Sequence, residues 1–406
     1  MTSASGRWPV RDALWFAAAL ILAGQWIVTR SLGVHLQPPL EAILPGVGIF
    51  GAAFMLSWAA ELAQLEISQA LALAFLALMA VLPEYAVDLY LAWTAAKDPS
   101  YTALAAANMT GANRILIGFG WPVILFCYWL RSRQREIKVE SEQRVDLAAL
   151  LVATVYAFLI PLKRTLSLVD TAFLVGLFAV YVVQSGKAHH VEPELEGPPA
   201  RIALLPRAWR RLATIALFLL PGYTIFIAAE PFAEGLMRCA EQLNVPKFVL
   251  IQWLAPLASE SPEFIVAILF ALKGNPMAGF GTLISSKVNQ WTLLIGMLPL
   301  AYSASGRHLQ PMVLDARQAE EILLTAAQSL LAVIMLTNWS FGLGEAVLLF
   351  ALFIAQLAIP IPWVHLAFAG LYVVLALGYL VMPSYRNSVK QLLVSGWRVS
   401  PRQDRS

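Results

Sequence analysis

Two proline–glutamate pairs stand inside long apolar segments, one in each half of the chain. Pro83-Glu84 lies in ALMAVLPEYAVDLYLAW, and Pro262-Glu263 lies in LAPLASESPEFIVAILF. A carboxylate is costly to place in hydrocarbon, so within an apolar segment it marks a functional site by default. A proline also breaks the local helix and frees the backbone carbonyl four residues before it. The repeated arrangement predicts a duplicated helix pair built around a cation.

Further carboxylates stand close to both pairs. Asp88 lies one helical turn after Glu84, and Glu260 lies one turn before Glu263. A calcium site needs about six to eight oxygen ligands, several of them from carboxylates. Glu84, Glu260 and Glu263 are the carboxylates expected to serve such a site. Asp88 has a second interpretation, as a hydrated residue near the outer mouth of the protein.

Two cationic residues, Arg114 and Lys287, follow the Pro-Glu segments in the two halves. If either side chain points into the same cavity, it cancels part of the negative charge. A buried lysine beside carboxylates can exchange its proton against a cation. The sequence therefore leaves Ca²⁺ exchange and monovalent cation/proton exchange both open. Alternatively, Glu84 and Glu263 form structural ion pairs with Arg114 and Lys287 that lock a helix bundle.

The composition excludes an ordinary soluble protein. Apolar residues form 59% of the 406-residue chain and charged residues 13%, whereas soluble domains average about 25% charged residues. The 13 Trp and 20 Phe suit membrane interfaces and lipid-facing surfaces. We therefore expect the lipid bilayer and inorganic cations as partners, no nucleic acid, and no cofactor apart from a transported cation. Cys127 and Cys239 lie in or near apolar segments and do not indicate a disulfide framework.

Apolar stretches of about 20 residues predict about twelve transmembrane helices, and hence an all-α polytopic membrane protein. They cover residues 12–32, 40–64, 68–96, 102–130, 146–162, 167–185, 209–231, 246–272, 277–304, 319–337, 342–359 and 363–382. The first segment is long and lacks a small-x-small cleavage site, which favours a retained signal anchor over a cleaved signal peptide.

Loop charges predict the orientation of the chain. The stretches 131–144 and 187–211 and the tail after Arg386 are rich in Arg and Lys, and with twelve spans they lie on one side together with the N-terminus. The loops on the opposite side carry few cations. The positive-inside rule then places both termini in the cytoplasm. The short loops fit an integral protein of a bacterial inner membrane.

The segments form two similar halves. Each half has an apolar helix, a Pro-Glu helix, a helix rich in small and polar residues, and two further helices. A unit of five spans is odd in number, so successive copies insert with opposite orientations, as inverted repeats. The expected domains are an extra helix (1–39), a first repeat (40–185), a cytoplasmic linker (186–208), a second repeat (209–360) and a C-terminal extra helix with a basic tail (361–406). In the linker, His189 and His190 have no third ligand nearby and are expected to be solvated.

The motifs resemble those of the sodium/calcium exchanger family of cation antiporters. That family carries Thr-Ser-x-Pro-Glu and then Gly-Ser-Asn-x-x-Asn/Asp once in each half. Here the first copy reads AVLPE at 80–84 and GANRIL at 111–116, and the second reads SESPE at 259–263 and SSKVNQ at 285–290. The resemblance extends over roughly residues 44–359.

The first copy departs from the family pattern. Ala80 and Val81 replace hydroxyl residues, Ala112 replaces a serine, and Leu116 replaces an Asn or Asp that would bind the ion. By contrast, the second copy remains polar. The cation ligands that the resemblance implies are Glu84, Asn113, Ser259, Glu260, Glu263, Ser286 and Gln290, and the candidates for charge coupling are Asp88, Arg114 and Lys287.

The function expected from the resemblance is secondary cation antiport, with Ca²⁺ or Na⁺ exchanged against Na⁺ or H⁺ by alternating access. The lost ligands keep a second class open, a transport-inactive sensor or scaffold. An intramembrane enzyme is disfavoured because HExxH, GxSG with a histidine, and paired intramembrane aspartates are absent from the sequence. None of the five histidines stands beside another candidate catalytic group; they are His35, His189, His190, His308 and His365.

Other polar and small residues have structural interpretations. Asn108 and Asn113 could form hydrogen bonds between helices, and this role is the favoured one for Asn108. Gly111, Gly118 and Gly120 are expected to allow close helix packing rather than to bind an ion directly.

Overall fold

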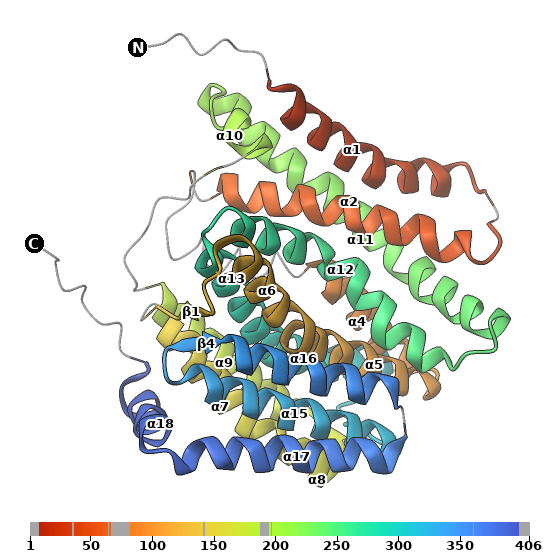
Figure 1. Cartoon of the computed structure of the whole chain (residues 1–406). Coiled ribbons are helices and arrows are strands. Elements are labelled where there is room, and N and C mark those ends of the chain that lie inside the picture. The colour runs from red at the N-terminus through yellow and green to blue at the C-terminus, as the bar shows by residue number, and fades with distance from the viewer. Residues whose placement is uncertain are drawn as a thin grey trace, which may run out of the picture. The chain divides into compact units, whose positions relative to one another are not determined.

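The structure is a computed structural model, and it describes residues 8–34, 36–63, 65, 82–140, 143–186, 195, 197–359 and 361–397. The described chain is almost entirely helical and forms two compact units (Figure 1). The first unit comprises Met1–Val87 and His189–Pro246, and the second comprises Asp88–Ala188 and Lys247–Ser406. Each unit therefore combines segments that are distant in the sequence.

The first unit is built on three long helices. They are α1 (Val10–Ser31), α2 (Leu40–Ala63) and α11 (Arg207–Gln242), with the short α10 (Pro198–Ile202) and the start of α4 (Leu82–Ala95). α2 packs against both α1 and α11. Pro231 lies inside α11 and cannot bond the carbonyl of Ile227. The indole Nε1 of Trp26 donates to that carbonyl at 3.2 Å, so α1 satisfies the group that the proline frees.

The second unit holds the remaining elements. Its helices are α5 (Ser100–Ile115), α6 (Trp121–Ser132), α7 (Arg144–Ala157), α8 (Leu159–Lys163), α9 (Leu168–Ser185), α12 (Lys247–Leu272), α13 (Pro276–Asn289), α14 (Ile295–Gly306), α15 (Ala316–Leu336), α16 (Leu343–Ala358), α17 (Pro362–Val381) and α18 (Pro383–Ser395). α15 lies at the centre of this unit: 89% of its most apolar 18-residue stretch is buried, whereas only 22% of the corresponding stretch is buried in α9 and in α17. α17 lies along α15 at the edge of the unit (Figure 1).

Both motif helices contain a π-helical turn. Leu116–Gly120 forms one between α5 and α6, and Gln290–Leu294 forms the other between α13 and α14. Their first residues, Leu116 and Gln290, are separated by 174 positions, the same separation as Asn113 and Lys287. π-Turns inside helices are rare and frequently mark functional sites. The two helices thus share a local distortion at equivalent positions.

A close approach between α5 and α12 explains one of the glycines. A Cβ atom at Gly111 would lie 1.8 Å from the carbonyl oxygen of Gln252, a position that no side chain can take. A Cβ atom at Gly118 would lie 2.3 Å from the Phe353 ring of α16. The expectation that these glycines serve helix packing is confirmed.

Two short antiparallel strand pairs join loops of the second unit. β1 (Glu136–Lys138) pairs with β4 (Ser340–Gly342), and β2 (Thr165–Leu166) pairs with β3 (Met312–Val313). The first pair connects the α6–α7 loop with the α15–α16 loop. The second connects the α8–α9 loop with the α14–α15 loop. In the predicted topology, the two loops joined by each strand pair lie on the same side of the membrane.

The predicted segments correspond to helices throughout the described chain, and 68–96 is described from residue 82 onward. Among the described helices, eight are long and apolar enough to cross a membrane, or nine if the bent α12 is one span. α12 bends by 58° between Lys247–Ser261 and Glu263–Leu272, at the predicted proline break. α11 continues to Gln242, past the predicted end at residue 231, although it contains Pro221 and Pro231.

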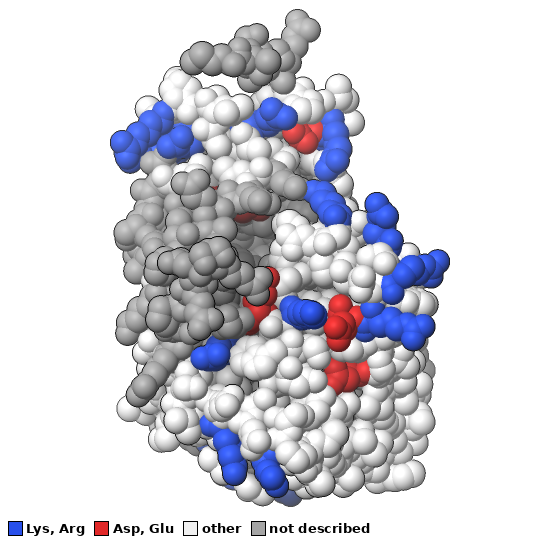
Figure 2. Space-filling model, turned by 60° about the vertical axis from the view of Figure 1, so that its left-hand side comes forward, with Lys and Arg blue, Asp and Glu red and all other residues white. Residues whose placement is uncertain are grey.

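The second unit carries a cluster of exposed basic residues on the turn between α6 and α7, which contains β1. Arg131, Arg133, Arg135 and Lys138 are exposed on the α6–α7 turn. Exposed Lys and Arg side chains stand out on the face shown in Figure 2, with fewer Asp and Glu among them. The predicted linker histidines lie outside the described residues, and both cysteines are free thiols.

Candidate functional site

Two of the predicted carboxylates lie on α12 and accept hydrogen bonds from the second motif helix. Ser286 donates its Oγ proton to Glu263 Oε2 at 2.6 Å. Gln290 donates from Nε2 to Glu260 Oε1 at 3.0 Å. Ser259 instead donates to carbonyls of its own helix, one of them that of Ala255 at 3.2 Å. The structure therefore brings together four of the predicted ligands, which are Glu260, Glu263, Ser286 and Gln290. The Ser259 hydroxyl group instead donates its proton to the backbone of its own helix.

Asp88 is fully buried at 0% exposure and accepts a hydrogen bond from Asn108 Nδ2 at 3.0 Å. This bond links α4 to α5, as predicted for Asn108. The alternative of a hydrated Asp88 near an outer mouth is wrong, because the surrounding helices exclude it from solvent.

Lys287 is also fully buried, and its ammonium group faces the first motif helix. Its Nζ donates to Asn113 Oδ1 at 2.6 Å and lies 4.2 Å from the centroid of the Trp291 ring. Asn113 in turn donates to the carbonyl of Met109 at 2.8 Å. The Asn113 side chain is thus already bonded to an internal cation in this state.

Electrostatic interactions join these groups into one site. Glu260 interacts with Glu263, Lys287 and Asp88, and all four side chains belong to the second unit. We call this group, Asp88, Glu260, Glu263 and Lys287, the charged site. Among the described residues, no group of three or more His, Cys, Asp and Glu side chains is arranged to hold a metal ion.

Several oxygen atoms at the charged site have no hydrogen-bond donor among the described residues. They are buried and have no hydrogen-bond partner within the described part of the chain: Asp88 Oδ2, Asn108 Oδ1, Glu260 Oε2 and Gln290 Oε1. A buried acceptor without a partner costs about 1–3 kcal/mol, and more if it is charged. Such atoms can be satisfied by protons on the carboxylates or by a bound cation.

Glu84 lies on α4, one turn before Asp88, with 2% of its surface exposed. It belongs to the first compact unit, whereas the charged site belongs to the second. Ala80 and Val81 lie outside the described residues. Ala112 and Leu116 are fully buried apolar residues, which offer no side-chain ligand.

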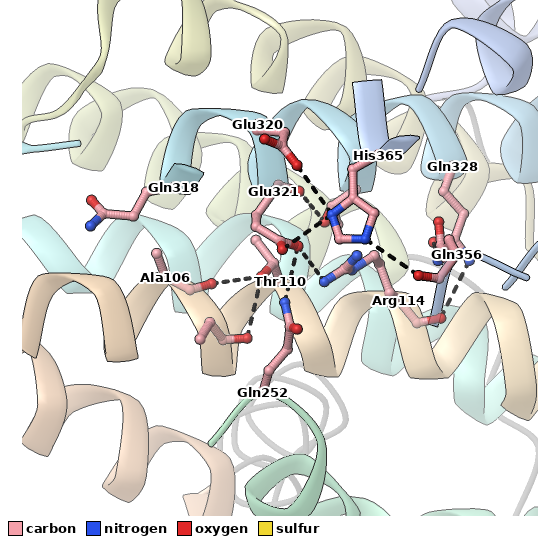
Figure 3. A network of polar contacts seen from close by, with 12 residues as sticks. Ala106, Thr110, Arg114, Gln252, Gln318, Glu320, Glu321, Gln328, Gln356 and His365 are labelled. Carbon is pink, nitrogen blue, oxygen red and sulfur yellow. Dashed lines mark hydrogen bonds and ion pairs between the residues drawn. The ribbon is translucent and has the colours of Figure 1, made fainter. Parts of the chain in front are cut away.

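Arg114 lies outside the charged site. Its Nη2 donates to Glu321 Oε2 on α15 at 2.5 Å (Figure 3). Its guanidinium lies 5.0 Å from the centroid of the Trp253 ring. Gln252 donates to the same carboxylate oxygen at 3.0 Å. The partner of Arg114 in the structure is therefore Glu321, a buried carboxylate on α15, and not one of the carboxylates of the Pro-Glu pairs as in the alternative prediction.

A buried network around Arg114 and Glu321 was not predicted from the sequence. His365 on α17 lies beside Glu320 and Glu321, with Nδ1 at 3.1 Å from Glu320 Oε1. The sequence did not indicate these acidic neighbours of His365, because they lie on another helix. The available signal was the Glu320-Glu321 pair within a predicted span, since carboxylates there mark functional positions.

The fold combines helices that are long and apolar enough to cross a membrane with carboxylates buried among them, such as Asp88 and Glu260. The chain belongs to the sodium/calcium exchanger protein family, whose model matches residues 43–186 and 213–361. It is thus a member of a family of membrane cation antiporters and not an enzyme.

Solved structures agree with this assignment. The crystal structure of the H⁺/Ca²⁺ exchanger CAX is 41% identical to this chain, covers 96% of it and 98% of its own length, and superimposes with a TM-score of 0.92. Native YfkE shares the fold at 16% identity, with 91% of this chain and 100% of its own covered and a TM-score of 0.61. The sodium–calcium exchanger NCX_Mj shares it at 15% identity, with 86% and 99% covered and a TM-score of 0.51. No curated protein matches the sequence significantly.

Proposed function

We propose that this protein is a secondary antiporter that exchanges Ca²⁺ against H⁺ at the charged site. The observation that carries the proposal is the set of buried oxygen acceptors around Asp88 and Glu260 that have no donor among the described residues. Calcium prefers oxygen ligands of this kind, from carboxylates and amide carbonyls. The 41% identical structure is that of an H⁺/Ca²⁺ exchanger, which supports the choice of ions.

Charge balance supports the same exchange. When ionised, Asp88, Glu260 and Glu263 contribute three negative charges, and Lys287 contributes one positive charge. The remaining charge of −2 is the charge that one Ca²⁺ or two protons balance. Because uncompensated charge is costly in a buried site, loading with calcium favours release of the protons.

The hydrogen bonds suggest how the residues divide the work. Ser286 and Gln290 hold one oxygen of each α12 carboxylate, which orients the other oxygen toward a proton or a cation. Lys287 contributes a fixed positive charge that limits how tightly the cation is held. The ligand role of Glu84 stays a prediction of the family resemblance, as does that of Asn113, which would have to part from Lys287.

Two structural features support alternating access between inverted repeats. The π-turns lie at equivalent positions, and the bond from Lys287 to Asn113 joins residues with the same separation. Each strand pair joins a loop of the first half to a loop of the second half, β1 to β4 and β2 to β3. Exchanging the two halves turns one pair into the other, as expected for inverted repeats related by a two-fold axis in the membrane plane.

Ion fluxes in sealed vesicles test the proposal. The purified protein is reconstituted, and Ca²⁺, Na⁺ and H⁺ fluxes are followed under imposed gradients for the parent, Glu263→Gln and Glu84→Gln. Glu136→Gln, on the exposed strand β1, is the matched control. We expect Ca²⁺ uptake driven by a proton gradient in the parent and the control, and its loss in Glu263→Gln. Exchange of Na⁺ against H⁺ without Ca²⁺ movement would replace calcium as the substrate. No flux of any of these ions from a folded protein would favour the transport-inactive alternative.

A further inference from the structure

A second cluster of titratable groups lies apart from the charged site, where α15 and α17 pack together. It consists of Glu320 and Glu321 on α15 and His365 on α17, with exposed fractions of 8%, 1% and 7%. Figure 3 shows both carboxyl groups directed toward the imidazole ring. Of these groups, the proposed exchange uses none.

Both nitrogen atoms of the His365 ring face oxygen atoms that accept hydrogen bonds. Nε2 lies 3.3 Å from the backbone carbonyl oxygen of Gln356. Nδ1 lies 3.1 Å from Glu320 Oε1 and 3.5 Å from Glu321 Oε1. A neutral imidazole carries one N–H group, so it can donate a hydrogen bond on only one side, either to the Gln356 carbonyl or to the carboxylates. The geometry requires one additional proton, either on the second ring nitrogen or on a carboxyl group.

The charges of the surrounding helices agree with one bound proton. From α5, Arg114 pairs with Glu321, which leaves Glu320 to be balanced. Arg317, on the exposed start of α15, interacts with Glu320 from a distance. A proton shared by His365 and Glu320 makes the buried group neutral.

The other elements packed against α17 supply no further counter-ion to this cluster in the described part of the chain. α16 presents the carbonyl of Gln356. Tyr372, on α17 itself, interacts with Arg114. On α18, Tyr385 bonds to Asn338 and Glu345 instead.

We propose that Glu320, Glu321 and His365 form a proton-binding site, separate from the charged site, that fastens α17 to α15. Loss of its proton leaves a ring lone pair and carboxylate oxygens facing one another at 3.1 Å. The contact between α15 and α17 is therefore strongest when the site is protonated and weakens as the pH rises. This inference does not depend on which cation is carried.

The network gives this site a connection to the first motif helix. Gln356 donates to Gln328 at 3.5 Å, and Gln328 donates to the carbonyl of Arg114 at 3.4 Å. Arg114 is the neighbour of Asn113, which accepts from Lys287. Changes at His365 can thus reach α5 through side chains that already contact one another.

Spectroscopy of the full chain tests the proposal without any transport measurement. The protein, with ¹⁵N-labelled histidine rings, is placed in lipid nanodiscs at pH 7, and the His365 signals are assigned by their loss in His365→Gln. His308→Gln, in an exposed loop, is the control and should remove a different set of signals. Infrared spectra of the parent, Glu320→Gln and Glu321→Gln report a protonated carboxyl group.

We expect either two protonated ring nitrogens on His365, or one together with a protonated-carboxyl band that Glu320→Gln or Glu321→Gln removes. A singly protonated ring without such a band would overturn the proposal.

Hydrogen exchange supplies a second readout that needs no assignment. Exchange of the amides at the start of α17 should accelerate at least tenfold more between pH 6 and 9 in the parent than in Glu320→Gln, after correction for intrinsic rates. Equal pH dependence in the two proteins would also contradict the proposal.

Discussion

At the scale of residues, the internal cation Lys287 is the feature that most distinguishes the charged site. Its ammonium group bonds to Asn113 and interacts with Glu260, so it occupies a position between the two motif helices. A fixed positive charge close to carboxylates weakens their affinity for protons and for cations alike.

Lys287→Met removes this charge while keeping a similar length. The carboxylates should then hold their protons more strongly, so the pH at which transport is half-maximal should rise by about one unit or more, since one unit corresponds to about 1.4 kcal/mol. Vesicle uptake of Ca²⁺ over a series of pH values measures the shift. Lys287→Arg, which keeps the charge, serves as the comparison, and an unchanged profile in Lys287→Met would remove Lys287 from the coupling.

The ion pair of Arg114 and Glu321 is buried, with 1% and 2% of the side chains exposed. Removing one partner leaves an uncompensated charge, so Arg114→Met should lower stability by about 3–5 kcal/mol. Adding Glu321→Gln should restore part of the loss, because the second charge is then also absent. Unfolding in a denaturing detergent series measures the cycle. Strictly additive losses would show that the two residues do not depend on each other.

At the scale of elements, the two motif helices share a π-turn, and α12 bends at its proline. The bend separates the part of α12 that bears Glu260 from the part that begins with Glu263. Both carboxylates nevertheless reach α13 and its π-turn, through Ser286 and Gln290. The close approach of α5 to α12 at Gly111 holds the first motif helix in this arrangement.

Gly111→Ala should disrupt that approach, because the new Cβ atom meets the backbone carbonyl of Gln252 at 1.8 Å. We expect a stability loss of about 1–3 kcal/mol or more, together with loss of transport. Gly176→Ala is the matched control, since a Cβ atom there meets nothing within 4 Å. Thermal unfolding of the detergent-solubilised protein measures both variants. A stable, active Gly111→Ala would show that α5 and α12 can separate without cost.

The sequence predicted the helices well and the long-range pairs poorly, for physical reasons. Apolar runs of spanning length are local signals. So are the Pro-Glu motif that identified Glu263 and the second family motif that identified its donor Ser286. The partner of Arg114, by contrast, is 207 residues away. Its choice depends on how α15 packs, which no local pattern encodes. His365 was missed in the same way, because its acidic neighbours lie on another helix.

At the scale of the whole molecule, the strand pairs predict which loops share a side of the membrane. Loops joined by β1 and β4 should face the cytoplasm with the basic α6–α7 turn, and loops joined by β2 and β3 should face the opposite side. Successive spans cross the membrane in opposite directions, so loops separated by an even number of spans lie on the same side.

Cysteine labelling tests this topology. After Cys127 and Cys239 are replaced by serine, Lys138→Cys and Val313→Cys are introduced at exposed positions. An impermeant maleimide should label Val313→Cys in intact cells and Lys138→Cys only after lysis. The reverse result would contradict the orientation, and labelling of both from one side would contradict the alternation.

Simultaneous counting of calcium ions and protons tests whether the two ions compete for the charged site. Proteoliposomes carry a calcium indicator and a pH indicator, and an inside-acid gradient is imposed. We predict Ca²⁺ entry accompanied by release of about two protons per ion, as the −2 charge of Asp88, Glu260, Glu263 and Lys287 requires. Both fluxes should disappear in Glu263→Gln. Calcium entry that continues unchanged after the proton gradient is collapsed, with no proton release, would show that the two ions are not exchanged at this site.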